Sequence, residues 1–256
     1  MKSIIYKFLF VTGLFGAVAC EDLQTVNVDP NNPSDIQSNI PMAGVEKQIM
    51  DNVYDAWFSG RQSLVYSQYW AQRNYTEEDR YQIRESTNNN YFNYFYQSAA
   101  NLEAIIEMNT NEATAPRMAA YGDNNNQIAA AKILKVWLYQ LMTDTWGAIP
   151  YSEASKLTEG KFYPKYDEQS EIYSGLMAEL DDAVSLIDES KPAFTSGDRI
   201  FDGDASKWKK FANSLKCRLA IHLSKVDSNW KTYIAEALTS GVFESNDDNA
   251  VYTYSV

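Results

Sequence analysis

The sequence contains few of the residues on which most enzyme centres and disulfide frameworks depend. Its 256 residues include one histidine and two cysteines, which excludes most zinc sites, histidine-based catalytic triads and disulfide scaffolds. Basic residues are also scarce, because 22 lysines and arginines are set against 34 acidic residues, for a net charge of -12. Phosphate backbones and anionic membrane surfaces are bound through lysine and arginine, so the composition argues against nucleic-acid partners and against membrane binding by the folded surface.

The chain begins with a short apolar run. Residues 8–19 (FLFVTGLFGAVA) carry no charge and follow Lys2 and Lys7, but the run is shorter than the roughly 20 residues that a membrane-spanning helix needs. This length is typical of a secretory signal peptide. Small residues lead directly to Cys20, and this ending resembles the lipobox of bacterial lipoproteins. We therefore predict a signal peptide over residues 1–19 and lipidation of Cys20, the alternative being an ordinary secretory signal with an incidental cysteine.

A lipid on Cys20 would anchor the protein, because each buried methylene contributes about 0.8 kcal/mol to membrane binding. Glu21 and Asp22 follow, and acidic residues at this position resemble the surface-export signal of Bacteroidetes lipoproteins. Residues 20–41 are rich in Asn, Asp, Pro and Ser, which predicts a tether after the lipidated cysteine. We expect a lipid-anchored outer-membrane protein, exposed at the cell surface, whose folded domain occupies residues 42–256.

Apolar residues recur with a helical period through most of this domain. The run from Ile128 to Met142 is apolar nearly all round, which predicts a central helix. Asp204 is suited to cap the N-terminus of a following helix, and Gly241 to end the last one. Other apolar stripes begin at Val45, Phe92, Ile172, Trp208 and Trp230. We predict an all-α fold of stacked helical hairpins with little β structure.

The last six residues, 251–256, alternate like a strand and are followed by no closing element. A strand without a partner is unusual at the end of a complete domain. We therefore expect a strand at this end of the chain and a domain that is truncated at its C-terminus.

Three further stretches, together with the N-terminus, resemble one family. They are residues 138–154 (LYQLMTDTWGAIPYSEA), 166–169 (YDEQ) and 203–216 (GDASKWKKFANSLK). In this order and spacing they resemble the SusD/RagB family of nutrient-binding outer-membrane lipoproteins. The resemblance implies tetratricopeptide-like helix pairs on one side, an irregular, loop-rich ligand face on the other, and a SusC-like TonB-dependent transporter as partner. Members are usually about twice as long, so the chain resembles the N-terminal half.

The segment from residue 66 to 96 combines aromatic and amide side chains, and its residues 72–90 show no sustained apolar period. It holds seven of the 18 tyrosines, with Trp70, Phe92 and Phe95. A pyranose offers an apolar C–H face that stacks on such rings and a rim of hydroxyls that pairs with amides and guanidinium groups. Rings from Tyr91 onward, and Trp57 before the segment, fall on helical stripes and are expected in the core. The predicted ligand contacts are Trp70, Asn74, Tyr75, Arg80 and Tyr81.

The remaining candidates for chemistry receive structural interpretations. His222 lies on an apolar stripe and is expected in the core, and Cys217 is expected to be a small buried hydrophobe beside Ile221. Residues 123–126 and 198–204 carry oxygen ligands but lack the layout of a calcium loop, so we expect solvated loops or N-caps. We predict no catalytic residues, no metal and no cofactor.

These observations favour a cell-surface protein that binds a nutrient, most simply an oligosaccharide, and delivers it to the transporter. A surface-anchored glycan-degrading enzyme is an alternative, since Glu77 to Asp79 and Asp181 with Asp182 provide neighbouring carboxylates. A helical-repeat adaptor that binds protein is the third possibility.

Overall fold

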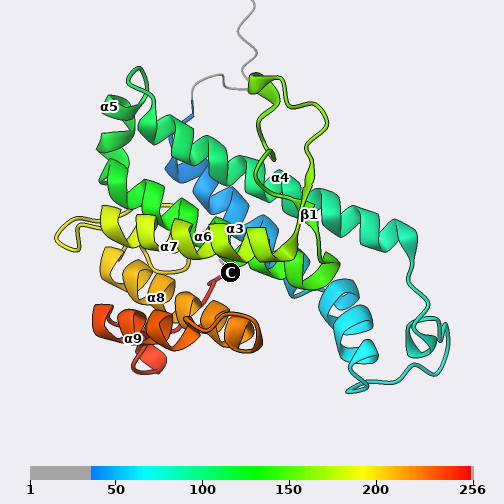
Figure 1. The fold of residues 1–256 in the computed structure, drawn as a ribbon. Coiled ribbons are helices and arrows are strands. Elements are labelled where there is room, and N and C mark those ends of the chain that lie inside the picture. Colours follow the sequence, from blue (N-terminus) through cyan, green and yellow to red (C-terminus); the bar gives the residue numbers. More distant parts are fainter. Residues whose placement is uncertain (1–35, 255–256) are drawn as a thin grey trace, which may run out of the picture. The chain divides into compact units, whose positions relative to one another are not determined.

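The computed structural model describes residues 36–254, so Cys20, the signal peptide and most of the tether lie outside the described residues. The folded unit begins at Gln37. Its helices are α3 (Asn39–Val53), α4 (Glu85–Thr110), α5 (Ala115–Met118), α6 (Asn124–Trp146), α7 (Gln169–Leu186), α8 (Ala205–His222) and α9 (Trp230–Ser240) (Figure 1). Within residues 36–254, each helix is too short or too polar to cross a bilayer.

Short elements connect these helices. A π-helix, η2 (Ala56–Leu64), follows α3, and the 3-10 turns are η3 (Glu78–Arg80), η4 (Ala119–Tyr121), η5 (Leu157–Glu159), η6 (Leu223–Lys225) and η7 (Asn246–Asp248). The strands β1 (Ile149–Pro150) and β2 (Tyr166–Asp167) pair antiparallel, with Ile149 opposite Asp167. The prediction of an all-α fold with little β structure is confirmed.

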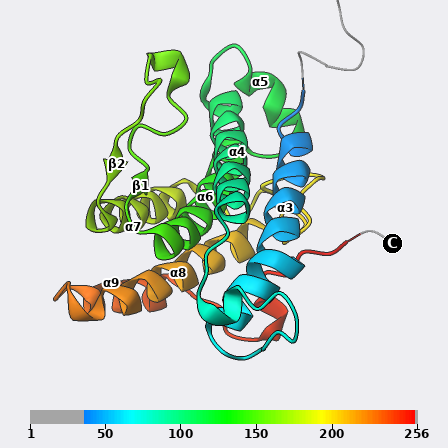
Figure 2. The ribbon, with the colours of Figure 1, turned by 90° about the vertical axis from the view of Figure 1, so that its right-hand side faces the viewer.

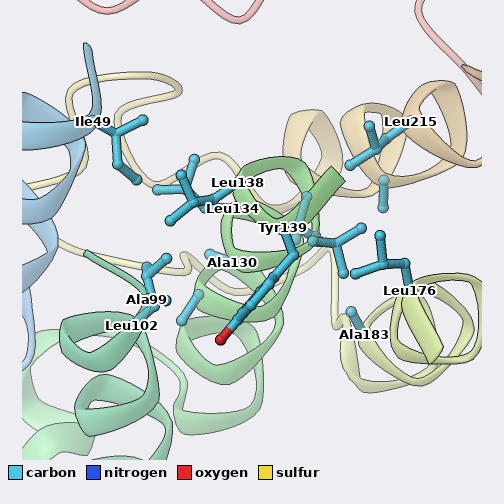
Figure 3. Close-up of a cluster of buried hydrophobic side chains, with 14 of the residues drawn as sticks. Ile49, Ala99, Leu102, Ala130, Leu134, Leu138, Tyr139, Leu176, Ala183 and Leu215 are labelled. Atoms are coloured by element: carbon cyan, nitrogen blue, oxygen red, sulfur yellow. The ribbon is translucent and has the colours of Figure 1, made fainter. Parts of the chain in front are cut away.

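Helix α6 is the centre of the core, as the largely apolar run from Ile128 to Met142 predicts. Ala130, Leu134 and Leu138 are at most 1% exposed, and α6 packs against α4, α7 and α8. Figure 3 shows its side chains meeting Leu102 of α4 on one side and Leu176 of α7 on the other. A helix that is buried on all sides has no polar face to give it an amphipathic period, which is why composition alone identified it.

Successive helices lie side by side. Helix α4 packs between α3 and α6, and α7, α8 and α9 follow in sequence order on the far side of α6 (Figures 1 and 2). Each helix therefore contacts its neighbours along the chain. This arrangement confirms the predicted stack of tetratricopeptide-like hairpins.

Aspartate caps begin two of the helices, α6 and α8. The carboxylate of Asp204 accepts hydrogen bonds from the backbone N–H groups of Ser206 and Lys207, and Asp123 caps α6 in the same way. At the other end of the last helix, Gly241 takes φ +102° directly after Ser240. These caps satisfy backbone groups that the helices leave unpaired, so the predicted N-cap roles and the stop at Gly241 are confirmed.

The long connection from α7 to α8 is closed around Asp198. This carboxylate is 3% exposed, and it accepts hydrogen bonds from the N–H groups of Ile200 and Gly203 and from the indole of Trp208. Gly203 is required here, because its φ is +80° and a Cβ would lie 1.9 Å from the carbonyl oxygen of Phe194. The connection is thus held to the start of α8 by a buried carboxylate.

Three expectations differ from the structure. Residues 251–254 form no strand. An alternating pattern needs a neighbouring strand to pair with, and here Thr253 bonds only to Arg199, donating to its carbonyl and accepting from its guanidinium group. Helix α3 begins at Asn39, within the range expected for the tether, because Pro41 is tolerated in a first helical turn. The stripe of α9 is only partly covered, since Ala237 is buried but Leu238 is 58% exposed.

Candidate ligand-binding site

The segment between α3 and α4, residues 54–84, projects from the N-terminal end of α4 (cyan to teal in Figure 1). It starts at Asp55, whose carboxylate accepts hydrogen bonds from the N–H groups of Trp57 at 3.0 Å and Phe58 at 2.6 Å. The hydroxyl of Tyr91, in α4, also donates to this carboxylate. One aspartate therefore begins the π-helix η2 and ties it to α4.

Aromatic packing also holds η2 in place. Phe58 is 6% exposed, and its ring centroid lies 5.1 Å from that of Tyr91 and 5.4 Å from that of Phe95. Tyr91 and Phe95 are buried, as predicted for this part of α4, whereas Tyr94 between them is 40% exposed. Burial raises the pKa of the Tyr91 hydroxyl, and its bond to Asp55 adds to the rise. The projecting segment thus has a rigid base.

Trp57 does not lie in the core, and that prediction is wrong. Its side chain is 39% exposed, and the guanidinium carbon of Arg61 lies 4.2 Å from the ring centroid. The prediction continued the apolar stripe that begins at Val45 through Trp57 with a period of 3.6 residues, but α3 ends at Val53. The chain then restarts with i to i+5 bonding, as in the bond from the N–H of Gly60 to the carbonyl of Asp55.

A buried carboxylate organises the arginines beside Trp57. Glu78 is 2% exposed, and its oxygens accept from Arg61 at 3.0 Å and Arg84 at 2.7 Å. Arg84 also bonds Glu77 at 2.9 Å. Burial alone raises the pKa of Glu78, but the hydrogen bonds from Arg84, its own backbone, Gln72 and Arg61 outweigh it and hold the pKa below the ordinary value. The cluster links η2, η3 and the start of α4.

The residues predicted to contact ligand are all at the surface. Trp70 is 61% exposed, Tyr75 77% and Tyr81 57%, and Asn74 and Arg80 are exposed as well. Because the rings are not sealed inside the helical stack, they remain available for stacking on a ligand.

Local contacts hold the rings of Tyr81 and Trp70 and the backbone at Tyr75. The Tyr81 ring stacks on Tyr66 with centroids 5.8 Å apart, and its hydroxyl donates to the Tyr66 carbonyl and accepts from Gln68. The ring of Trp70 lies against η2, 3.7 Å from where a Cβ on Gly60 would be. Arg61 reaches the carbonyl oxygen of Tyr75 at 3.4 Å.

The backbone of this loop is strained at three side-chain-bearing residues. Gln68, Tyr75 and Tyr81 have φ between 56° and 63°, in the left-handed region that bulky residues avoid. Such conformations cost roughly 1–3 kcal/mol each and persist where the surroundings fix them. Two of the three are tyrosines predicted to contact ligand.

Comparison with known proteins gives the family. The SusD-like family model described as "Starch-binding associating with outer membrane" matches residues 30–256. The chain belongs to the SusD-like family. Comparison with curated proteins gives no match.

Solved SusD-like structures share the fold. A chitin-binding protein has 30% identity and a TM-score of 0.68, covering 82% of this chain and 45% of its own. A chitin-binding SusD homolog from Flavobacterium johnsoniae has 27% identity and a TM-score of 0.63, covering 83% and 46%. A SusD homolog from Parabacteroides distasonis has 27% identity and a TM-score of 0.64, covering 83% and 39%. The chain therefore spans less than half the length of these relatives.

A polar cavity of this SusD-like chain lies away from the predicted site. It has a volume of about 870 Å³ and is lined by residues of α7, α9 and the end of α8, with Asp144 near the end of α6. The hydroxyl of Tyr173 donates to Asp144 at 2.6 Å and contacts Nδ1 of His222 at 2.9 Å. Burial raises the pKa of Tyr173, and its bond to Asp144 adds to the rise.

His222 is therefore not a core residue, and that prediction is wrong. Its side chain is 46% exposed. Helix α8 ends at this residue, beyond the part of its apolar stripe that the neighbouring helices bury. Ile221, beside it, is 57% exposed for the same reason. Cys217, one turn earlier, is a free thiol of intermediate exposure rather than a fully buried one.

Four of the five carboxylates considered for hydrolysis pair with a lysine or an arginine. Asp181 pairs with Lys216 at 2.6 Å and Asp182 pairs with Lys132 at 2.5 Å, as Glu77 and Glu78 pair with arginines. Asp79 accepts from the backbone N–H of Gln72. These contacts give each carboxylate a structural partner.

The sequence did not indicate one further carboxylate pair. Glu103 and Glu179 line a cavity of about 580 Å³, and Lys135 bonds them at 2.8 and 2.7 Å. Burial lowers the pKa of Lys135, but the two carboxylates outweigh it and raise the pKa above the ordinary value. Lys135 therefore bridges the two carboxylates and gives each of them a charged partner.

Proposed function

We propose that this protein binds an oligosaccharide at the segment formed by residues 54–84, without breaking its bonds, and delivers it to a SusC-like TonB-dependent transporter. The observation that carries the proposal is the exposure of Trp70, Tyr75 and Tyr81 on a loop whose base is rigid. Membership of a family described as starch-binding, and the chitin-binding relatives, support a glycan as ligand.

The chemistry of the segment suits a sugar. Exposed rings stack on the C–H face of a pyranose, and Trp57, backed by Arg61, adds a ring that the sequence had assigned to the core. Asn74 and Arg80 offer donors and an acceptor to the hydroxyl rim.

We also propose that the protein is held at the outer membrane by a lipid on Cys20, with residues 20–38 as a tether that leads into α3. The anchor would keep the binding domain close to the transporter while the acidic domain contributes no membrane binding of its own. Labelling with a radioactive or clickable fatty acid tests this, since Cys20→Ser should abolish the label.

Titration calorimetry against a panel of malto- and chito-oligosaccharides tests the ligand site. We expect Trp70→Ala and Tyr75→Ala each to weaken binding about tenfold, because each removes one stacking ring. Tyr163→Ala is the matched control, since Tyr163 is 96% exposed and lies outside the segment. Binding that is unchanged in both Trp70→Ala and Tyr75→Ala would show that the site lies elsewhere.

A further inference from the structure

A smaller cavity lies beside the first two turns of α4, where that helix passes the strands β1 and β2. Its volume is about 410 Å³, within the range of ligand pockets, about 300–1,000 Å³. The residues that matter for its chemistry are Glu85, Asn88, Asn89, Phe92, Trp146 and Tyr166. They come from α4, the end of α6 and β2, so the cavity exists only in the folded chain.

Two of its rings form a fixed wall. The Phe92 and Trp146 rings meet edge to face with centroids 5.3 Å apart, and Trp146 also packs against Phe95, which is fully buried. Tyr166 is different, because its ring is 64% exposed although it belongs to the short sheet. Core packing accounts for the position of Trp146 but leaves the Tyr166 ring open to a ligand.

One polar group of the cavity is oriented by a hydrogen bond, and the polar side chains can form further hydrogen bonds. The indole N–H of Trp146 donates to Oδ1 of Asn88 at 2.7 Å, which fixes the amide and leaves its NH₂ group as a donor. Asn89 and Glu85 are exposed, and their side chains make no hydrogen bond or ion pair within residues 36–254. The cavity thus offers amide donors and acceptors, one free carboxylate and exposed aromatic surface.

We propose that this cavity is a saccharide subsite for one pyranose unit of a neutral glycan. The rings provide a stacking surface, the amides pair with hydroxyls, and Glu85 accepts from hydroxyls while it disfavours an anionic sugar. The inference rests on the proposed function, because it takes the residue 54–84 segment as the first part of the site.

The two parts of the site are linked through consecutive residues. Arg84 holds Glu77 and Glu78 in the segment, and Glu85 lines the cavity. Cα atoms of neighbouring residues are about 3.8 Å apart, so the cavity begins where the segment ends. A chain of several sugar units that spans both parts would have a second point of attachment on α4.

The test uses a substitution that fills the cavity with a larger side chain and leaves the other residues that line it in place. Ala148 contributes only a methyl group to the lining, so Ala148→Phe should occupy the space, and Ala148→Ser is the matched control that leaves it open. Binding of malto- and chito-oligosaccharides of two to six units is measured by calorimetry for both full-length variants, with near-ultraviolet circular dichroism to verify that each is folded.

If the cavity is a subsite, wild-type affinity rises with oligosaccharide length, and Ala148→Phe weakens hexasaccharide binding about tenfold while changing disaccharide binding little. Tyr166→Ala should reproduce this loss without filling the cavity. Equal hexasaccharide affinity in wild type, Ala148→Phe and Tyr166→Ala overturns the subsite. A different result would contradict the proposed function, namely oligosaccharide binding that is unchanged in both Trp70→Ala and Tyr75→Ala. The two outcomes are therefore distinguishable.

Discussion

Glu46 of α3 and Asp198 of the α7–α8 connection are two buried carboxyl groups that face each other. Glu46 is fully buried and Asp198 is 3% exposed. Oε2 of Glu46 accepts from the N–H of Arg199 at 2.7 Å, while Asp198 is surrounded by N–H donors. Burial, and after it the charge of Asp198, raises the pKa of Glu46 to about 9. Glu46 is therefore protonated in the folded protein at neutral pH.

This pair makes stability depend on pH. In the unfolded chain Glu46 loses its proton near pH 4.5, whereas the folded protein keeps it to about pH 9, so the stabilising contribution is complete below pH 4.5 and is lost as pH rises towards 9. We expect Glu46→Gln, which mimics the protonated carboxyl, to flatten this dependence, with a difference of up to about 1.4 kcal/mol per pH unit. Urea unfolding between pH 5 and 9 measures it, and equal slopes in both proteins would contradict the assignment.

Neighbouring aromatic residues should respond in opposite ways to the same substitution. We expect Trp57→Ala to leave stability nearly unchanged, because its side chain is 39% exposed, but to weaken oligosaccharide binding by about threefold to tenfold. Phe58→Ala should destabilise the protein by about 3–5 kcal/mol, since its ring fills the space against Tyr91 and Phe95. Thermal unfolding and calorimetry on both variants decide the point; equal stability loss would place Trp57 in the core after all.

The carboxylate of Glu78 should control the order of the binding loop. Glu78→Gln leaves Arg61 and Arg84 without their charged partner, and we expect a loss of about 1–2 kcal/mol, less than for a fully buried pair because both arginines reach solvent. Limited proteolysis should then cleave within residues 66–84 faster than in wild type. Asp182→Asn, which removes an exposed pair with Lys132, is the control and should not change the cleavage rate.

Two glycines with the same backbone angle should differ in their tolerance of a side chain. Gly160 and Gly203 both have φ +80°, but a Cβ on Gly160 meets nothing within 4 Å, whereas one on Gly203 would lie 1.9 Å from the carbonyl oxygen of Phe194. We expect Gly160→Ala to cost about 1–2 kcal/mol from backbone strain alone and Gly203→Ala at least about 2 kcal/mol more. Denaturant midpoints compare them; similar values would mean that the α7–α8 connection shifts freely.

Part of this structure follows from local sequence. The nearly continuous apolar run of Ile128 to Met142 predicted a central helix. Asp204 was suited to cap a helix from a position three residues before Lys207. Both features depend on neighbours along the chain. The exposed rings of Trp70, Tyr75 and Tyr81 were predictable for a related reason: the segment that carries them has no apolar period with which to bury them.

Other features depended on where helices end. The period that placed Trp57 in the core stops at Val53, and the one that placed His222 there runs out at the last turn of α8. A periodic pattern gives the face of a helix but does not show how far the neighbouring element covers it. That is decided by the lengths and positions of packed helices, which the sequence pattern does not contain.

The sequence by itself determined the helical class, the central helix, the caps and the aromatic, amide-rich segment. Only the tertiary structure decided that Trp57 joins Arg61 at the surface, that Glu46 meets Asp198, and that Tyr166 and Trp146 enclose a cavity with the start of α4. The first group rests on residues a few positions apart. The second brings together groups from separate elements, whose proximity is set by packing and has no signature along the chain.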